Sequence, residues 1–298
     1  GSVCDKGSAL DFDGVNDYTR ISNPYYSFTD EITVSWWVNF RDGAKLKCAW
    51  MGQSTSSVDN MSSNVWLMHP RNSYEIQFLV NDNGIWRAAT IIGTPGWHLV
   101  TGVADQSGTR VYLDGVLQSS GLGISSGIKI NSNSILDIGK DPRYNTSRGR
   151  NANMQADEIS VWNRALSQTE INELKTKCLT GTEIGLVGYW QLNEGSGSSF
   201  SDLSPTGAHG TLTSTMDPLS DWTSSGAGMT SGVSGSSNQV TLTVEDVNGN
   251  TSTANAVVTV EDNVPPVAIA QNVTVQLDAT GHGSTTAALV NNVSTDAC

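Results

Sequence analysis

The spacing of short apolar runs limits most strongly what this chain can fold into. β-Branched and aromatic residues form these runs, and Gly, Ser, Thr and Asn interrupt them about every ten residues. We therefore predict strands over residues 9–13, 32–40, 65–68, 74–80, 85–92, 97–104, 110–113 and 135–138. This pattern predicts an all-β fold, and 298 residues suffice for one large sandwich plus a small partner or for two ordinary domains.

The sequence also predicts two turns and one helix between the strands. Residues 81–84 (NDNG) tolerate positive φ and predict a hairpin over 74–92, and Asp114-Gly115 predicts a second one. Ser167 and Glu170 fit a capping box, with Leu166 and Ile171 as its hydrophobic staple. The sequence thus predicts a short structural helix that lies against the sandwich.

The composition changes near residue 220. Residues 221–238 are rich in Ser, Gly and Thr and predict a linker between a first domain, 1–220, and a β segment, 239–298. In that segment, strands over 240–244 and 256–260 flank a turn-forming stretch and predict a hairpin.

The net charge of the chain makes some classes of binding partner unfavourable. Acidic residues outnumber basic ones 29 to 16, which gives a net charge of −13 that repels the phosphates of nucleic acids. A cation or a glycan fits this balance, although an acidic surface also serves solubility alone. No apolar stretch is long enough to span a bilayer, so we expect no membrane insertion.

Seven short motifs together resemble one known family over roughly residues 9–215. They are 9–18 (ALDFDGVNDY), 96–100 (GWHLV), 111–115 (VYLDG), 157–167 (DEISVWNRALS), 188–190 (GYW), 202–204 (DLS) and 209–212 (HGTL). The chain resembles the concanavalin A-like, laminin G-like jelly-roll family. The resemblance implies a β-sandwich of two antiparallel sheets with one short helix. The last three motifs either complete this sandwich or begin a second copy, and completion is favoured because few residues remain before the linker.

The C-terminal segment resembles a different family. From Gln239 the chain is similar to the immunoglobulin-like, hyalin-type repeats of large bacterial surface proteins, with 240–261 as the end of one repeat and 265–298 as the start of the next. The resemblance implies a secreted or cell-surface location. We expect a monomeric part of a larger multidomain protein.

Two of the cysteines could form a disulfide, which would agree with a secreted or cell-surface location. Cys4 and Cys178 flank the first domain, and a disulfide between them would close it in an oxidising compartment. The alternative is that both are reduced.

The family resemblance also implies a calcium ion near the turn after the first strand, with Asp13, Asp17 and Asp157 as its ligands. Ca²⁺ takes six to eight oxygen ligands, and an Asp-Gly-x-x-Asp turn offers carboxylates and carbonyls together. The alternative is that these aspartates stabilise turns by accepting hydrogen bonds from nearby backbone amides.

Aromatic and basic residues are the candidates for ligand contact. Of the nine tryptophans, four in strong strand patterns are predicted to be core residues, Trp37, Trp97, Trp162 and Trp190. Three near turns are candidate sugar platforms, Trp50, Trp66 and Trp86. Arg143, Tyr144 and Arg148 form a basic stretch that could bind an acidic polysaccharide or pair with neighbouring acids.

Catalysis is not favoured by the sequence. Glycoside hydrolysis needs two suitably spaced carboxyl groups on one face, whereas Asp157 and Glu158, as neighbours in a strand, are expected to point to opposite faces. His98 is predicted to be a sheet residue. The sequence predicts a non-catalytic, calcium-stabilised carbohydrate-binding module acting in adhesion. A glycan hydrolase or lyase on the same fold, or a structural spacer, are the alternatives.

Overall fold

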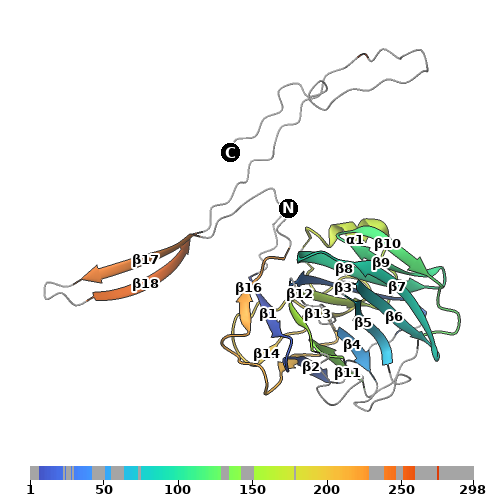
Figure 1. Cartoon of the computed structure of the whole chain (residues 1–298), viewed down its shortest axis with the longest axis horizontal. Coiled ribbons are helices and arrows are strands. Elements are labelled where there is room, and N and C mark those ends of the chain that lie inside the picture. The colour runs from blue at the N-terminus through green and yellow to red at the C-terminus, as the bar shows by residue number, and fades with distance from the viewer. Residues whose placement is uncertain are drawn as a thin grey trace. The chain divides into compact units, whose positions relative to one another are not determined.

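A computed structural model describes residues 7–22, 24, 28, 30–41, 51–54, 64–72, 75–128, 134–141, 151–177, 179–227, 238–245, 251–258 and 274. The chain divides into two units, Gly1–Gly228 and Met229–Cys298 (Figure 1). The first unit is a sandwich of two antiparallel sheets, so the predicted jelly-roll fold is confirmed.

The first sheet, here called sheet A, has the strand order β10-β9-β8-β3-β12-β1-β16, with β13 also paired to β12. Its strands are β1 Ser8–Asp13, β3 Ile32–Phe40, β8 Gly96–Asp105, β9 Gly108–Leu113, β10 Val116–Gly121, β12 Asn153–Trp162, β13 Leu186–Trp190 and β16 Trp222–Ser224.

The second sheet, sheet B, has the order β14-β15-β2-β11-β4-β5-β6-β7. Its strands are β2 Thr19–Ser22, β4 Met51–Ser54, β5 Asn64–Asn72, β6 Glu75–Asp82, β7 Ile85–Ile92, β11 Ile135–Ile138, β14 Ser199–Phe200 and β15 Gly210–Leu212. All eight strands predicted from the apolar runs are present in the two sheets.

The core lies between the inner faces of the two sheets. Side chains alternate in direction along a strand, so every second residue enters it. Trp36 of sheet A and Phe78 of sheet B are fully buried in this cluster, together with Trp190 from β13. Of the four tryptophans predicted to be core residues, Trp190 lies in this core, Trp37 and Trp162 are buried on the outer face of sheet A, and Trp97 is half-buried.

Both predicted hairpins of the sandwich are confirmed. Asn83 and Gly84 have φ of 46° and 100°, and Asp114 and Gly115 have φ of 51° and 81°. Two consecutive residues with positive φ match the right-handed twist of the strands on either side. These turns join β6 to β7 and β9 to β10.

Helix α1, Gln168–Glu173, has the predicted capping box: the Ser167 side chain accepts from the Glu170 backbone, and the Glu170 side chain accepts from the Ser167 backbone. Ile171 is buried and packs with Leu166 and Tyr189 in a second apolar cluster. The helix therefore covers the outer face of sheet A, beside β9 and β10 (Figure 1).

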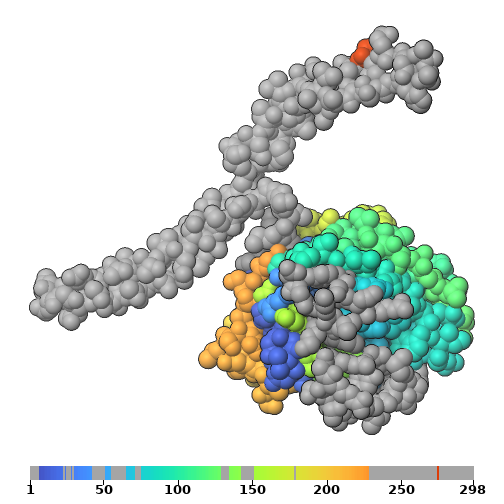
Figure 2. Space-filling model, viewed as in Figure 1, coloured from blue at the N-terminus to red at the C-terminus, as the bar shows by residue number. Residues whose placement is uncertain are grey.

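The late strands complete the sandwich and do not begin a second copy. β13 pairs with β12, β15 with β2, and β16 with β1. Figure 2 shows the orange C-terminal part of this unit beside its blue N-terminal part. Residues 222–224, which were predicted to belong to the linker, form strand β16 with Trp222 buried, because the Ser- and Gly-rich composition of this stretch concealed a strand.

The second unit contains one described hairpin. β17, Asn238–Glu245, pairs antiparallel with β18, Thr251–Val258, which confirms the predicted pairing. Beyond β18 only Thr274 is described, so the immunoglobulin-like resemblance stays a prediction. Among the described residues, no helix is long and apolar enough to cross a membrane.

Candidate functional site

The outer face of sheet B carries a row of polar side chains. The register places His69 of β5 opposite Gln77 of β6, and Gln77 opposite Thr90 of β7. The neighbours Met68, Phe78 and others point into the core, so this row points away from it. All three row residues are half-buried, and with strands about 4.8 Å apart the row spans about 10 Å.

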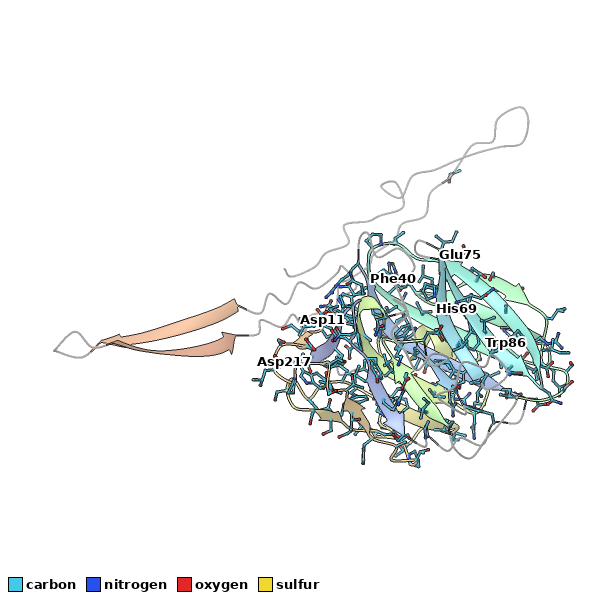
Figure 3. All side chains as sticks on the ribbon, turned by 60° about the horizontal axis from the view of Figure 1, so that its bottom comes forward. Asp11, Phe40, His69, Glu75, Trp86 and Asp217 are labelled. Atoms are coloured by element: carbon cyan, nitrogen blue, oxygen red, sulfur yellow. The ribbon has the colours of Figure 1, made fainter. Side chains whose placement is uncertain are left out.

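Trp86 lies on the same face and strand as Thr90. Four residues of strand separate them, which is about 13 Å at about 3.3 Å per residue. Its side chain is half-buried, and Figure 3 shows Trp86, His69 and Glu75 on the neighbouring strands of this sheet. A half-buried indole on the same face as polar side chains combines an apolar surface with hydrogen-bonding groups.

A buried aspartate fixes the hairpin that carries Trp86. Asp82 is buried and accepts hydrogen bonds from Arg87 Nε at 2.9 Å and Nη2 at 2.6 Å, and from the Ser125 backbone at 2.9 Å. Burial alone would raise the pKa of Asp82, but these hydrogen bonds lower it to about 2. The ionised carboxylate therefore holds the β6–β7 turn in place beside Trp86.

Trp66 is not a surface platform, so that prediction is wrong. It lies within β5, is fully buried in the core cluster, and donates from Nε1 to Gln53 Oε1 at 3.0 Å. Its inward direction follows from pairing with Val80, another core residue. The other predicted contact residues, Trp50, Arg143, Tyr144 and Arg148, lie outside the described residues.

The middle of sheet B, where β2 pairs with β11, carries a charged cluster that the sequence did not reveal. Arg20 of β2 donates to Asp137 of β11 through Nε at 2.8 Å and Nη2 at 2.9 Å. The Lys140 Nζ atom lies 4.4 Å from the centre of the Tyr18 ring, and the Arg20 guanidinium carbon lies 5.6 Å from it. Only the alternation of Arg20 between Thr19 and Ile21 could have placed this arginine on the outer face.

Asp13 and Asp17, two of the three predicted calcium ligands, lie together in the β1–β2 turn. The Asp13 Oδ1 atom accepts from the Val15 backbone at 2.7 Å, and Asp17 Oδ2 accepts from the Asp13 backbone at 3.0 Å. Burial and the nearby carboxylates of Asp13 and Asp221 raise the pKa of Asp17 to about 6. The turn thus concentrates negative charge around a buried carboxyl group.

Asp157, the third predicted ligand, is elsewhere. Asp13 pairs with Asn153 in β12, and Asp157 lies four residues further along that strand, about 13 Å away. Its Oδ2 atom accepts from the Ser225 hydroxyl at 2.5 Å. The three aspartates therefore do not form one calcium site, and no other group of three His, Cys, Asp or Glu side chains suited to a metal occurs in the described part of the chain.

A β-bulge corrects the expectation for Asp157 and Glu158. The pairing of β12 with β3 shifts register between Asp157 and Ser160, and Glu158 has φ of 49°. Ala156 and Ile159 on either side of the pair belong to the core. Both carboxyl groups therefore lie on the outer face of sheet A, because the extra residue of a bulge breaks the alternation.

His98 connects two turns at the end of the sandwich. Its Nδ1 atom lies 2.7 Å from Asp114 Oδ2, and its Nε2 atom lies 3.0 Å from the Thr94 hydroxyl. The imidazole ring stacks on Phe40, with 5.6 Å between ring centres. The Thr94 hydroxyl lies on an exposed turn, so we interpret this series as a link between the β7–β8 and β9–β10 turns.

Comparison with known proteins agrees with this architecture. Residues 13–172, more than half of the chain, match the concanavalin A-like lectin/glucanases superfamily. The chain belongs to this superfamily. No curated protein sequence matches it.

One solved structure supports the same fold, and a second shows a weaker likeness. A candidate carbohydrate-binding protein from Bacteroides ovatus superposes with a TM-score of 0.53 at 18% identity, covering 74% of this chain and 60% of that one. The chain thus spans less than two thirds of that protein. A heptameric pentraxin from Limulus polyphemus gives a TM-score of 0.43 at 14% identity, covering 58% of this chain and 83% of that one.

Proposed function

We propose that the chain is a non-catalytic carbohydrate-binding module of a secreted or cell-surface protein, acting in adhesion. The observation that carries this proposal is the outer face of sheet B, where half-buried Trp86 shares a surface with the row of His69, Gln77 and Thr90. Membership of a superfamily that contains lectins supports it.

The chemistry of this face suits a sugar. The apolar face of a pyranose ring packs on an indole, while its hydroxyl groups exchange hydrogen bonds with amide, imidazole and hydroxyl groups. Gln77 Nε2 already lies 3.4 Å from the Thr90 hydroxyl, a long hydrogen bond that a sugar hydroxyl could replace. The length of the surface between Trp86 and Thr90 favours an oligosaccharide over a single sugar.

A glycan array tests the proposal. We expect the protein to bind a defined subset of glycans, and the bound glycans to be recovered intact after prolonged incubation. Cleavage of a bound glycan would instead establish a hydrolase or lyase. An array without signal would favour a structural spacer.

Calcium stabilisation is a second part of the proposal, with fewer ligands than the three that the family resemblance implied. Asp13 and Asp17 would be the carboxylate ligands, because they lie together in this turn and the Asp221 carboxylate adds negative charge close to Asp17. Asp157 would not contribute. Carboxylate oxygens suit Ca²⁺, and a bound cation would offset the repulsion among these groups.

Melting curves in calcium and in chelator test this part. We expect chelation to lower the melting temperature of the wild-type protein and to have no effect on the Asp17→Asn variant. Asp157→Asn serves as the control, since it removes a carboxylate outside the turn and leaves the calcium response intact. Identical wild-type curves in both buffers would remove calcium from the account.

A further inference from the structure

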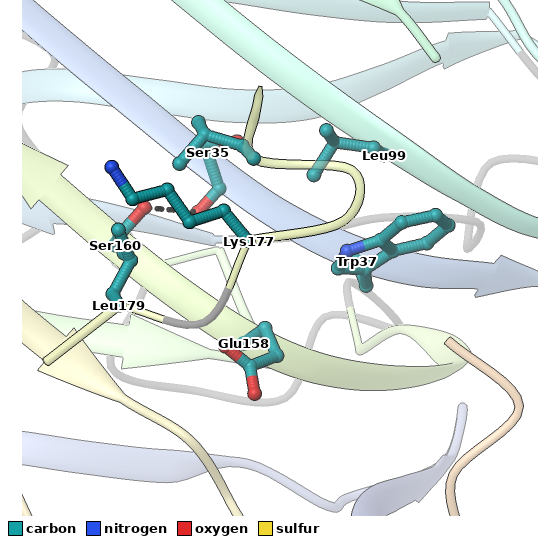
Figure 4. Close-up of a pocket in the computed structure, with 8 residues that line it drawn as sticks. Ser35, Trp37, Leu99, Glu158, Ser160, Lys177 and Leu179 are labelled. Carbon is teal, nitrogen blue, oxygen red and sulfur yellow. Dashed lines mark hydrogen bonds between the residues drawn. The ribbon is translucent and has the colours of Figure 1, made fainter. Parts of the chain in front are cut away.

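A small cavity lies on the outer face of sheet A, beneath the chain that follows α1. It is lined by Trp37 and Ser35 of β3, Glu158 and Ser160 of β12, and Lys177, among others (Figure 4). Its volume is about 10 Å³. That is close to the smallest volume that holds one water molecule.

Trp37 presents an unsatisfied donor to this cavity. Its side chain is 4% exposed, and its indole Nε1 has no acceptor among the described residues. Figure 4 shows this nitrogen on the edge of the ring that faces Lys177 and the space above Glu158. An indole N–H can only donate, so a partner at this position must accept a hydrogen bond.

Glu158 supplies the complementary acceptor. It is 8% exposed, and its Oε2 atom accepts from the Tyr189 hydroxyl at 2.7 Å. A carboxylate has about four acceptor positions and can accept hydrogen bonds from several donors at once. Lys177, at the cavity, lies 3.4 Å from the Glu173 carboxylate.

We propose that this cavity binds one ordered water molecule, which accepts the N–H of Trp37 and donates to the carboxylate of Glu158. Water fits because it accepts and donates at once. An ammonium ion has no acceptor, and a metal cation would face the indole N–H. The hydroxyl groups of Ser35 and Ser160 supply further polar walls, which separates this cavity from an apolar one that stays dry.

The water completes a chain of hydrogen bonds at the position where β12 changes its pairing partner. Before the bulge, β12 pairs with β1 through Ala156, and after it β12 pairs with β13 from Ile159 onward. The chain Trp37–water–Glu158–Tyr189 links β3, β12 and β13 across this change of partner. The water thereby helps to hold Glu158 in its left-handed conformation, which a non-glycine residue adopts only with support from its surroundings.

NMR of the intact protein with ¹⁵N-labelled tryptophan tests the proposal. We expect a cross-relaxation signal between the Trp37 indole proton and a long-lived water. Trp36 is the internal control: its Nε1 also lacks an acceptor among the described residues, yet it lies in the apolar core and should show no water signal. Absence of the signal at Trp37 would overturn the proposal.

High-resolution crystal structures of the wild type and of Trp37→Phe test the proposed water site independently. We expect one density peak within hydrogen-bond distance of Trp37 Nε1 and a Glu158 carboxylate oxygen, and loss or displacement of that peak in the variant. Glu158→Gln, which keeps an acceptor oxygen, should retain the peak. A direct contact of Trp37 Nε1 with a protein acceptor, or an empty cavity, would contradict the proposal.

Discussion

The outer faces of the two sheets differ in what lies on them. On sheet A, Tyr189 and Trp162 are buried beneath α1 and its flanking chain, and Trp37 and Leu99 pack with Ala227. On sheet B, the row of His69, Gln77 and Thr90 is half-buried, as is Trp86 on the same face. The protein's own chain thus covers sheet A, while sheet B presents polar and aromatic groups together.

Because of this difference, we expect substitutions on the two outer faces to have different effects. Substitutions on the outer face of sheet A should lower the free energy of unfolding, because they remove buried apolar contacts. Substitutions on the outer face of sheet B should change binding more than stability.

The largest expected loss of stability comes from the cover of sheet A. Ile171→Ala removes a fully buried side chain of α1 and should lower the free energy of unfolding by about 2–5 kcal/mol. Chemical denaturation measures this change. Ile184→Ala, at a position 87% exposed, is the matched control and should change it by less than about 0.5 kcal/mol.

The predicted disulfide would have the next largest effect. Cys4 and Cys178 lie outside the described residues, and their pairing stays a prediction. If they pair, reduction should lower the free energy of unfolding by about 2–4 kcal/mol, because the unfolded chain gains freedom. Peptide mapping by mass spectrometry without reductant checks the bond, and free thiols at both positions would refute it.

The pH dependence of Asp17 sharpens the calcium proposal. Its folded pKa of about 6 exceeds the ordinary 3.8, so in chelator its stabilising contribution is complete below pH 3.8 and is lost as the pH rises through 6. In chelator at pH 7, Asp17→Asn should therefore raise the free energy of unfolding by roughly 1–3 kcal/mol.

In calcium the sign should reverse, because the variant loses a ligand. Thermal melts of both proteins over pH 4–8, with and without calcium, measure the two effects. A variant that is less stable than the wild type in chelator at pH 7 would contradict the assigned pKa.

The helix cap should give the smallest change. Ser167→Ala removes the side chain that accepts from the Glu170 backbone and should lower the free energy of unfolding by about 1 kcal/mol. Ser167→Asp keeps an acceptor and should stay close to the wild type. Equal losses in both variants would show that the cap is not the cause.

The fold was predictable because local signals agreed with tertiary packing. The NDNG and Asp114-Gly115 turns, the capping box at Ser167 and the β-branched runs each determine a short segment by backbone preference alone. Family motifs added the late strands, which pair with β2 and β12 far away in sequence.

The candidate site was less predictable because it depends on register. Trp66 lies in a core position that is set by its pairing with Val80. The alignment of β1 with β12 places Asp157 four residues away from the partner of Asp13. The bulge in β12 turns Glu158 to the same face of sheet A as Asp157. Strand register decides each case, and turn residues or apolar periodicity do not encode it.

The most direct test of the account is a glycan array probed side by side with the wild type, Trp86→Ala and Ile184→Ala. The account predicts that wild type and Ile184→Ala bind the same glycans, and that Trp86→Ala loses them, with an affinity reduced about 30-fold for a loss of about 2 kcal/mol. Its melting temperature should stay above that of Ile171→Ala. Unchanged glycan binding by Trp86→Ala would contradict the assignment of the outer face of sheet B as the binding surface.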